Sequence, residues 1–174
     1  MTTPLLYTEE QRRLRDATPW TLVQGVLAPV QFLVFIVSLV LVLRFLATGA
    51  GQDAATWSIV IKTFTLYTIM VTGCIWEKEV FGVYVFAPAF YWEDMFSAVV
   101  IALHTAYLVA LFTDTLSVRG QMLLALAAYA TYVINAGQFV LKLRAARLEQ
   151  ARRDALSGRV PGGPAGPAGQ KAAA

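Results

Sequence analysis

Four long runs of apolar residues divide the chain, and each is long enough to cross a lipid bilayer. They cover Leu22–Phe45, Ala55–Ile75, Trp92–Phe112 and Gln121–Leu141. A helix needs about 20 largely apolar residues, at about 1.5 Å each, to span the hydrocarbon core. The pattern therefore predicts an all-α integral membrane protein with four transmembrane helices, forming a single domain over residues 1–149.

Polar segments flank these runs at both ends of the chain. Thr8 and Gln11 have the spacing of a capping box, which predicts a short helix on the membrane surface within residues 1–20. A basic helix begins at Lys142. Residues 150–174 hold the end of that helix and a tail rich in Pro, Gly and Ala, which we expect to be disordered.

The stretch Ile75–Asp94, IWEKEVFGVYVFAPAFYWED, lies between the second and third runs. Its middle, Val80–Tyr91, is apolar but contains Gly82 and Pro88, and about 12 residues are too few to cross a bilayer. We therefore expect an interfacial or re-entrant loop between helices 2 and 3.

Acidic residues border this aromatic loop, and they are the best candidates for chemistry. An apolar setting raises the pKa of a carboxyl group and can make it a proton donor at neutral pH. Other interpretations stay open. Acids at the start of a helix interact favourably with the helix dipole, and acids beside a Lys can be ordinary interfacial charges. The acids are Glu77, Glu79, Glu93 and Asp94.

Composition supports a lipid environment and excludes several classes of partner. The chain is 57% hydrophobic and only 14% charged, whereas soluble domains are about a quarter charged. Its basic residues lie toward the ends and are not interleaved with stacking aromatic residues, so we expect no nucleic-acid partner. A single cysteine, Cys74, excludes an internal disulfide and a cysteine-rich metal site.

The distribution of Lys and Arg predicts the orientation in the membrane. With four spans, the two termini and the central loop share one side. Arg44 and Arg119 lie on the other side and Lys62 lies within a span, which leaves eleven of the 14 basic residues on the first side. The positive-inside rule then places both termini and the loop in the cytoplasm.

Polar residues recur at helical spacing within the spans, and these faces should point into the bundle because polar groups in lipid are costly. They could simply join helices by hydrogen bonds. His104, the only histidine, could bind a porphyrin metal, relay a proton or bond another helix. Lys62 we expect to snorkel outward. The three faces contain Gln24, Gln31 and Ser38; Glu93, Ser97 and His104; and Thr131, Asn135, Gln138 and Lys142.

Three long strings resemble the vinyl bacteriochlorophyllide hydratase family of photosynthetic bacteria. They are DATPWTLVQGVLAPVQFLVF (Asp16–Phe35), the segment from Thr72 through IWEKEVFG to FAPAFYWED, and LAAYATYVINAGQFVLKLRAARLE (Leu126–Glu149). The likeness runs in order from about Tyr7 to Glu149. It implies a membrane-bound hydro-lyase of bacteriochlorophyll biosynthesis, which adds water to the C3-vinyl group of a chlorophyllide-type tetrapyrrole and gives a 1-hydroxyethyl group.

The chemistry of such a hydration suggests roles for the residues. One carboxylic acid donates a proton to the terminal vinyl carbon, and a second, ionised carboxylate accepts a proton from water and stabilises the cation. We assign Glu77 with Glu93 or Asp94 to this pair, and His104 as an alternative proton relay or magnesium contact. No resident metal or cofactor is expected. The residues expected to bind the substrate are Trp76, Phe81, Tyr84, Phe86, Phe90, Tyr91, Trp92, Asn135 and Gln138.

The same residues also suit a non-catalytic membrane protein that binds a tetrapyrrole or assists assembly of a photosynthetic complex. A transporter is a weaker alternative, because no inverted repeat is visible and few charges lie within the spans. The resemblance implies location in the bacterial inner, intracytoplasmic membrane. The expected partners are the tetrapyrrole, the lipid bilayer, and possible further copies of the chain or other pigment-synthesis enzymes.

Overall fold

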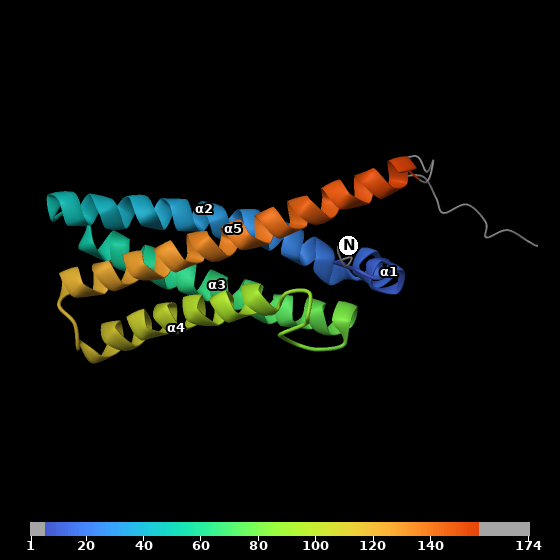
Figure 1. The fold of residues 1–174 in the computed structure, drawn as a ribbon. Helices are drawn as coiled ribbons and strands as arrows, with labels where there is room; N and C mark the ends of the chain where they lie inside the picture. The colour runs from blue at the N-terminus through green and yellow to red at the C-terminus, as the bar shows by residue number, and fades with distance from the viewer. Residues whose placement is uncertain (1–5, 157–174) are drawn as a thin grey trace, which may run out of the picture. The chain divides into compact units, whose positions relative to one another are not determined.

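A computed structural model describes residues 6–156, which form five α-helices and no strand. Four of the helices are long and apolar enough to cross a membrane. The predicted all-α fold with four spanning helices is therefore confirmed, and the chain is a multi-pass membrane protein (Figure 1). The helices are α1 (Glu9–Ala17), α2 (Pro19–Thr48), α3 (Gln52–Phe81), α4 (Tyr91–Thr113) and α5 (Val118–Leu156).

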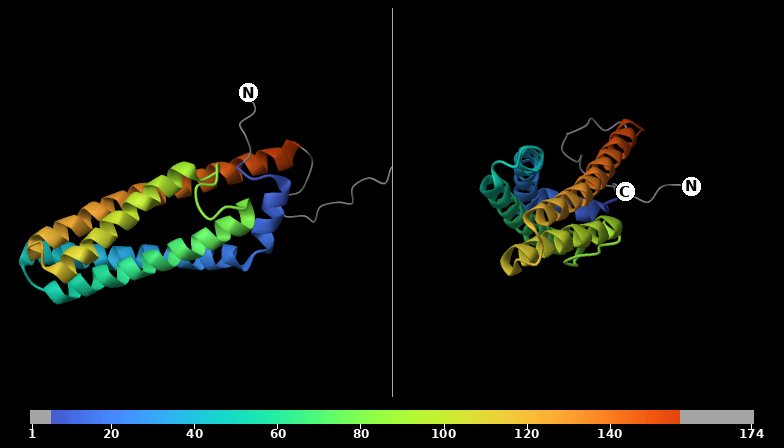
Figure 2. Two further views of the ribbon diagram at one scale, coloured as in Figure 1. Left: turned by 90° about the horizontal axis from the view of Figure 1, so that it is seen from below. Right: turned by 90° about the vertical axis from the view of Figure 1, so that its left-hand side faces the viewer.

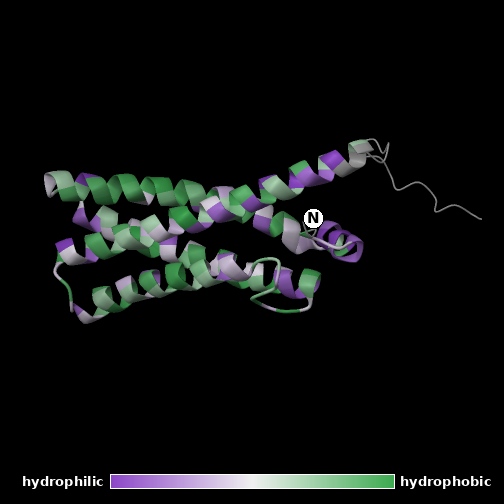
Figure 3. Cartoon of the chain, viewed as in Figure 1, coloured by the Kyte–Doolittle hydropathy of each residue, from purple (hydrophilic) through white to green (hydrophobic). Residues whose placement is uncertain are grey.

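Hydropathy distinguishes the spanning helices from the short first one. Mean hydropathy reaches 2.8 over the most apolar 18 residues of α2. By contrast, α1 is strongly polar and is drawn mostly in purple in Figure 3. Many large apolar side chains of α2 are exposed, including Leu33 and Val37. An outward-facing apolar surface of this kind is suited to lipid.

Side-chain and backbone groups cap several helix ends. The predicted capping box of α1 is present, with Gln11 N–H donating to Thr8 Oγ1 at 3.2 Å. Gly82, with φ of 81°, ends α3, and only glycine takes such a conformation without strain. Since α3 continues to Phe81, Glu77 lies in its last turns and the following loop is limited to residues 82–90.

The described chain consists of two units. Residues up to Phe139 form the larger one, and the second begins at Val140 within α5. The basic helix predicted from Lys142 is confirmed by the continuation of α5 to Leu156. The tail from residue 157 onward lies outside the described residues, and the predicted division at residues 149 and 150 stays a prediction.

Within the larger unit, α2, α3, α4 and the first part of α5 run alongside one another (Figure 2). Aromatic and aliphatic side chains from all four fill the space between them. Phe35 of α2 packs edge-on against Tyr129 of α5, with ring centroids 5.4 Å apart. The fully buried side chains of this core include Val42, Ile59, Val100, Tyr107, Met122 and Tyr129.

The polar faces point into the bundle, as their spacing predicts. Ser58 donates to the Ala55 carbonyl at 2.7 Å, so its oxygen accepts from Ser38, and Ser38 in turn accepts from Tyr129. This relay links α2, α3 and α5 in the core. Gln24 is half-buried and donates to Thr72 Oγ1 at 2.7 Å.

Lys62 does not reach the membrane surface. Its side chain is 0% exposed, and its Nζ lies 3.9 Å from the centroid of the Tyr132 ring. The prediction that it snorkels outward is wrong, because Lys62 lies on the same helical face as Ser58 and Leu66, which are buried in the bundle.

Candidate active site

The centre of the candidate site is a pair of carboxylates held by two successive backbone amides. The Phe86 N–H donates to Asp94 Oδ2 at 2.7 Å, and the Ala87 N–H donates to Glu77 Oε1 at 2.6 Å. Glu77 comes from the last turns of α3 and Asp94 from the first turn of α4. One short loop therefore fixes both acids at the same place.

The loop reaches this geometry through an uncommon backbone conformation. Phe86 has φ of 61°, in the left-handed region that non-glycine residues seldom occupy. Such conformations cost of order 1–3 kcal/mol and are held only where surrounding contacts determine them. At Phe86, the hydrogen bonds from its own amide to Asp94 and from the Ala87 amide to Glu77 are such contacts.

The two carboxyl groups also interact directly. Because they bind consecutive amides, the carboxyl groups of Glu77 and Asp94 lie close together, and two negative charges so near each other repel. Glu77 is only 6% exposed, so its carboxyl group is largely shielded from water. The structure therefore brings together Glu77 and Asp94, two of the four acids that the sequence singles out.

The remaining predicted catalytic residues lie elsewhere on α4. Glu93 is 7% exposed and belongs to the buried face of α4 with Ser97 and His104. His104 is ten residues beyond Asp94, about 15 Å along the helix. The structure thus separates His104 from the carboxylate pair, and its catalytic role stays a prediction.

The aromatic residues expected to bind substrate fall into two groups. Three of them, Trp76, Phe81 and Phe90, pack against one another with centroid separations of 5.7–5.9 Å. Tyr7 stacks on Phe81 at 5.8 Å and Phe139 stacks on Phe90 at 5.9 Å. These five form a packed cluster that joins the segment before α1 to α3, α4 and α5.

The other four aromatic residues are exposed on the loop and the start of α4. We call them the aromatic patch; they are Tyr84, Phe86, Tyr91 and Trp92. Phe86 and Tyr91 have ring centroids 5.6 Å apart, and Tyr91 meets Trp92 edge-on at 5.6 Å. Because the Phe86 amide binds Asp94, this apolar surface adjoins the carboxylate pair.

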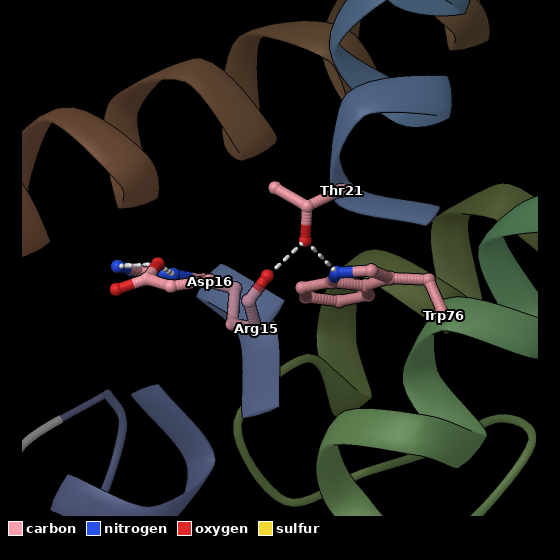
Figure 4. A network of polar contacts seen from close by, with 4 residues as sticks. All are labelled: Arg15, Asp16, Thr21 and Trp76. Atoms are coloured by element: carbon pink, nitrogen blue, oxygen red, sulfur yellow. Dashed lines mark hydrogen bonds and ion pairs between the residues drawn. The ribbon is translucent and has the colours of Figure 1, made fainter. Parts of the chain in front are cut away.

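The start of the chain is fastened to the same end of α3. The Trp76 indole N–H donates to Thr21 Oγ1 at 2.9 Å, and Thr21 donates to the Arg15 carbonyl at 2.6 Å (Figure 4). Thr18 donates to a Glu79 carboxylate oxygen. Trp76 and Glu79 therefore position α1 and α2 against α3.

Asn135 and Gln138, also expected to bind substrate, lie on α5. Asn135 is buried and donates to Ser97 Oγ at 2.8 Å, and Gln138 is half-buried. Sequence reasoning missed the backbone amides of Phe86 and Ala87 and the packing of Tyr7 and Phe139. Their only signal in the sequence is the short interval between Gly82 and Pro88. That interval indicates a tight loop, but it does not show which groups the loop amides bind.

These features define a multi-pass membrane protein in which a pair of acids, one buried and one half-buried, adjoins an exposed apolar aromatic surface. The comparisons with known proteins identify its family. Residues 7–145 match the family described as 2-vinyl bacteriochlorophyllide hydratase, and the chain belongs to that family. It is accordingly an enzyme, a hydro-lyase of bacteriochlorophyll biosynthesis.

Two curated relatives carry the same description. One, from Rhodobacter capsulatus, is 72% identical over 150 residues, covering 86% of this chain and 87% of the relative. The other, from Cereibacter sphaeroides, is 74% identical over 145 residues, covering 83% of this chain and 89% of the relative. No solved structure matches the chain significantly.

Proposed function

We propose that this hydratase adds water to the C3-vinyl group of a bacteriochlorophyllide-type tetrapyrrole, using Glu77 and Asp94 as its acid–base pair. The relatives are described as 2-vinyl bacteriochlorophyllide hydratases, which supports a vinyl-bearing substrate of this class. The observation that carries the proposal is the fixing of both carboxylates by the adjacent amides of Phe86 and Ala87.

A proton shared by the two acids serves the first step. Two carboxylates held on consecutive amides favour sharing one proton, because two negative charges so close together repel each other. The protonated member donates to the terminal vinyl carbon, and the positive charge that develops on the inner carbon is delocalised into the macrocycle. The ionised member stabilises this charge electrostatically.

Water then attacks the inner carbon and gives up a proton to the ionised carboxylate. The hydroxyethyl product has gained one proton and one hydroxide, which together are one water molecule. The proton of the pair now lies on the other carboxyl group. Return of the proton from one member of the pair to the other restores the starting state. The pair therefore needs no resident redox group for this cycle.

The aromatic patch suits the flat face of the macrocycle. Trp92 is 68% exposed and Tyr84 is 60% exposed, so both rings are accessible to a ligand at the membrane interface. A tetrapyrrole lying on this surface would have its edge beside Asp94. Trp76, Phe81 and Phe90 of the packed cluster instead pack against one another and hold the end of the loop against α3.

Turnover distinguishes this proposal from a non-catalytic pigment-binding role. Purified protein given vinyl bacteriochlorophyllide in ¹⁸O-labelled water is expected to form hydroxyethyl product that carries the label. Mass spectrometry of the extracted pigment measures it, with heat-denatured protein as the control. A shift in the pigment absorption spectrum without labelled product would support the carrier instead.

We further propose that the carboxylate pair faces the cytoplasm of the bacterial inner membrane, since most Lys and Arg lie on that side. In a Cys74→Ser background, Gln52→Cys is expected to react with a membrane-impermeant maleimide in intact spheroplasts. Glu10→Cys should react only after permeabilisation. Gel shifts measure the labelling, and the reverse pattern would contradict the orientation.

A further inference from the structure

The middle of the bundle contains a second group of polar side chains, separate from the carboxylate pair. Lys62 lies 15 residues before Glu77 on α3, about 22 Å along the helix. Its Nζ lies over Tyr132 and also 5.8 Å from the centroid of Tyr129. It has no hydrogen-bond partner among the described residues, and an unsatisfied donor costs several kcal/mol in hydrocarbon.

His104 of α4 presents a complementary acceptor. Its Nδ1 lies 2.7 Å from the Val100 carbonyl oxygen, which only accepts, so Nδ1 carries the hydrogen. In the neutral imidazole, Nε2 is then an acceptor, and it is buried without a partner in the described part of the chain. The His104 ring lies 5.9 Å from that of Tyr129, the same ring that Lys62 approaches.

Gln31 adds a third helix to this group. It is 2% exposed, and neither its amide nitrogen nor its amide oxygen has a partner within residues 6–156. It lies one turn before Phe35, whose ring contacts Tyr132 at 5.0 Å. Three helices therefore carry unsatisfied polar atoms in the part of the bundle core around Tyr129 and Tyr132.

The mixture of donors and acceptors determines which ligand fits. A metal cation would be opposed by the N–H donors of Lys62, and an anion by the lone pairs of His104 Nε2 and the Gln31 amide oxygen. Water donates and accepts in equal number, and buried waters typically make about three hydrogen bonds to otherwise unsatisfied groups. We propose that the bundle centre is a built water site, in which ordered water bridges Lys62 Nζ to His104 Nε2 with Gln31 as a third partner.

A double-mutant cycle tests the bridge. Lys62→Met and His104→Phe are each expected to lower the Tm in detergent by several degrees, because each leaves the other group unsatisfied. The double variant should lose clearly less than the two single losses added together, since both partners are then apolar. A rise in Tm for Lys62→Met with additive effects would overturn the proposal.

A control cycle and a direct probe complete the test. Lys62→Met combined with Thr113→Val, nine residues beyond His104 on α4, should give additive losses. Magnetisation transfer from water to the His104 ring protons, measured by NMR in micelles, is expected in the wild-type chain. Because it uses the wild-type chain, this measurement tests the water site even where a variant does not fold. An absent water signal, or an ion at this position in an experimental density map, would overturn the proposal.

Discussion

Glu77→Gln is expected to lower the kcat of the hydratase by about 10²–10⁴-fold, the usual contribution of a general acid–base group. Glutamine keeps an oxygen that can accept from the Ala87 N–H, so the loop retains its hydrogen bond. It cannot carry the proton shared with Asp94. The measurement is the rate of hydroxyethyl product formation under saturating substrate.

Glu79→Gln is the matched control for this variant. Glu79 is two residues away on the same helix, but it is exposed and accepts a hydrogen bond from Thr18 instead of a loop amide. It should keep the wild-type rate within about threefold, since surface substitutions change little. Near-normal activity of Glu77→Gln would remove the carboxylate pair from the mechanism.

Two further variants identify the partner of Glu77. Asp94→Asn should reduce kcat as strongly as Glu77→Gln, because an asparagine amide can neither donate nor accept the catalytic proton. Glu93→Gln should have the smaller effect, since Glu93 lies on the buried face with Ser97. The opposite order would assign the second catalytic role to Glu93.

Phe90→Ala is expected to have the largest effect on stability, lowering the free energy of unfolding by about 3–5 kcal/mol. Phe90 is 3% exposed and contacts Trp76, Phe81 and Phe139. Removing its ring leaves a cavity where three helices meet. Unfolding in mixed detergent micelles, followed by tryptophan fluorescence, measures the loss.

Trp92→Ala separates packing from substrate binding. Trp92 is two residues from Phe90 but 68% exposed, so its removal should change stability by no more than about 0.5 kcal/mol. If the aromatic patch binds the macrocycle, the variant should raise KM while kcat changes less. An unchanged KM would exclude Trp92 from the substrate surface, and a large loss of stability would contradict its exposed position.

Much of the architecture could be predicted because membrane-spanning helices are encoded locally. Each needs only a long apolar run, so α2 and α4 were predicted with ends within a few residues. The polar face of Gln31 and Ser38 was predicted for the same reason, since their spacing of seven returns to the same side of a helix. Lys62 was misplaced because a lysine at this depth can either extend to the surface or stay inside, and tertiary packing decides between them.

The sequence by itself determined the fold class, the four spans, the family and the acids worth testing, because these depend on residue type and on helical spacing. Only the tertiary structure decided which acids meet. Adjacent residues on a helix point about 100° apart, so Glu93 and Asp94 face different surroundings. Glu93 is buried in the bundle, while Asp94 and Glu77 bind the adjacent amides of Phe86 and Ala87. The same holds for the aromatic residues: contacts from distant Tyr7 and Phe139 bury Phe90 and leave Trp92 exposed. Contacts between segments far apart in the chain are absent from any local pattern, and those contacts build the site.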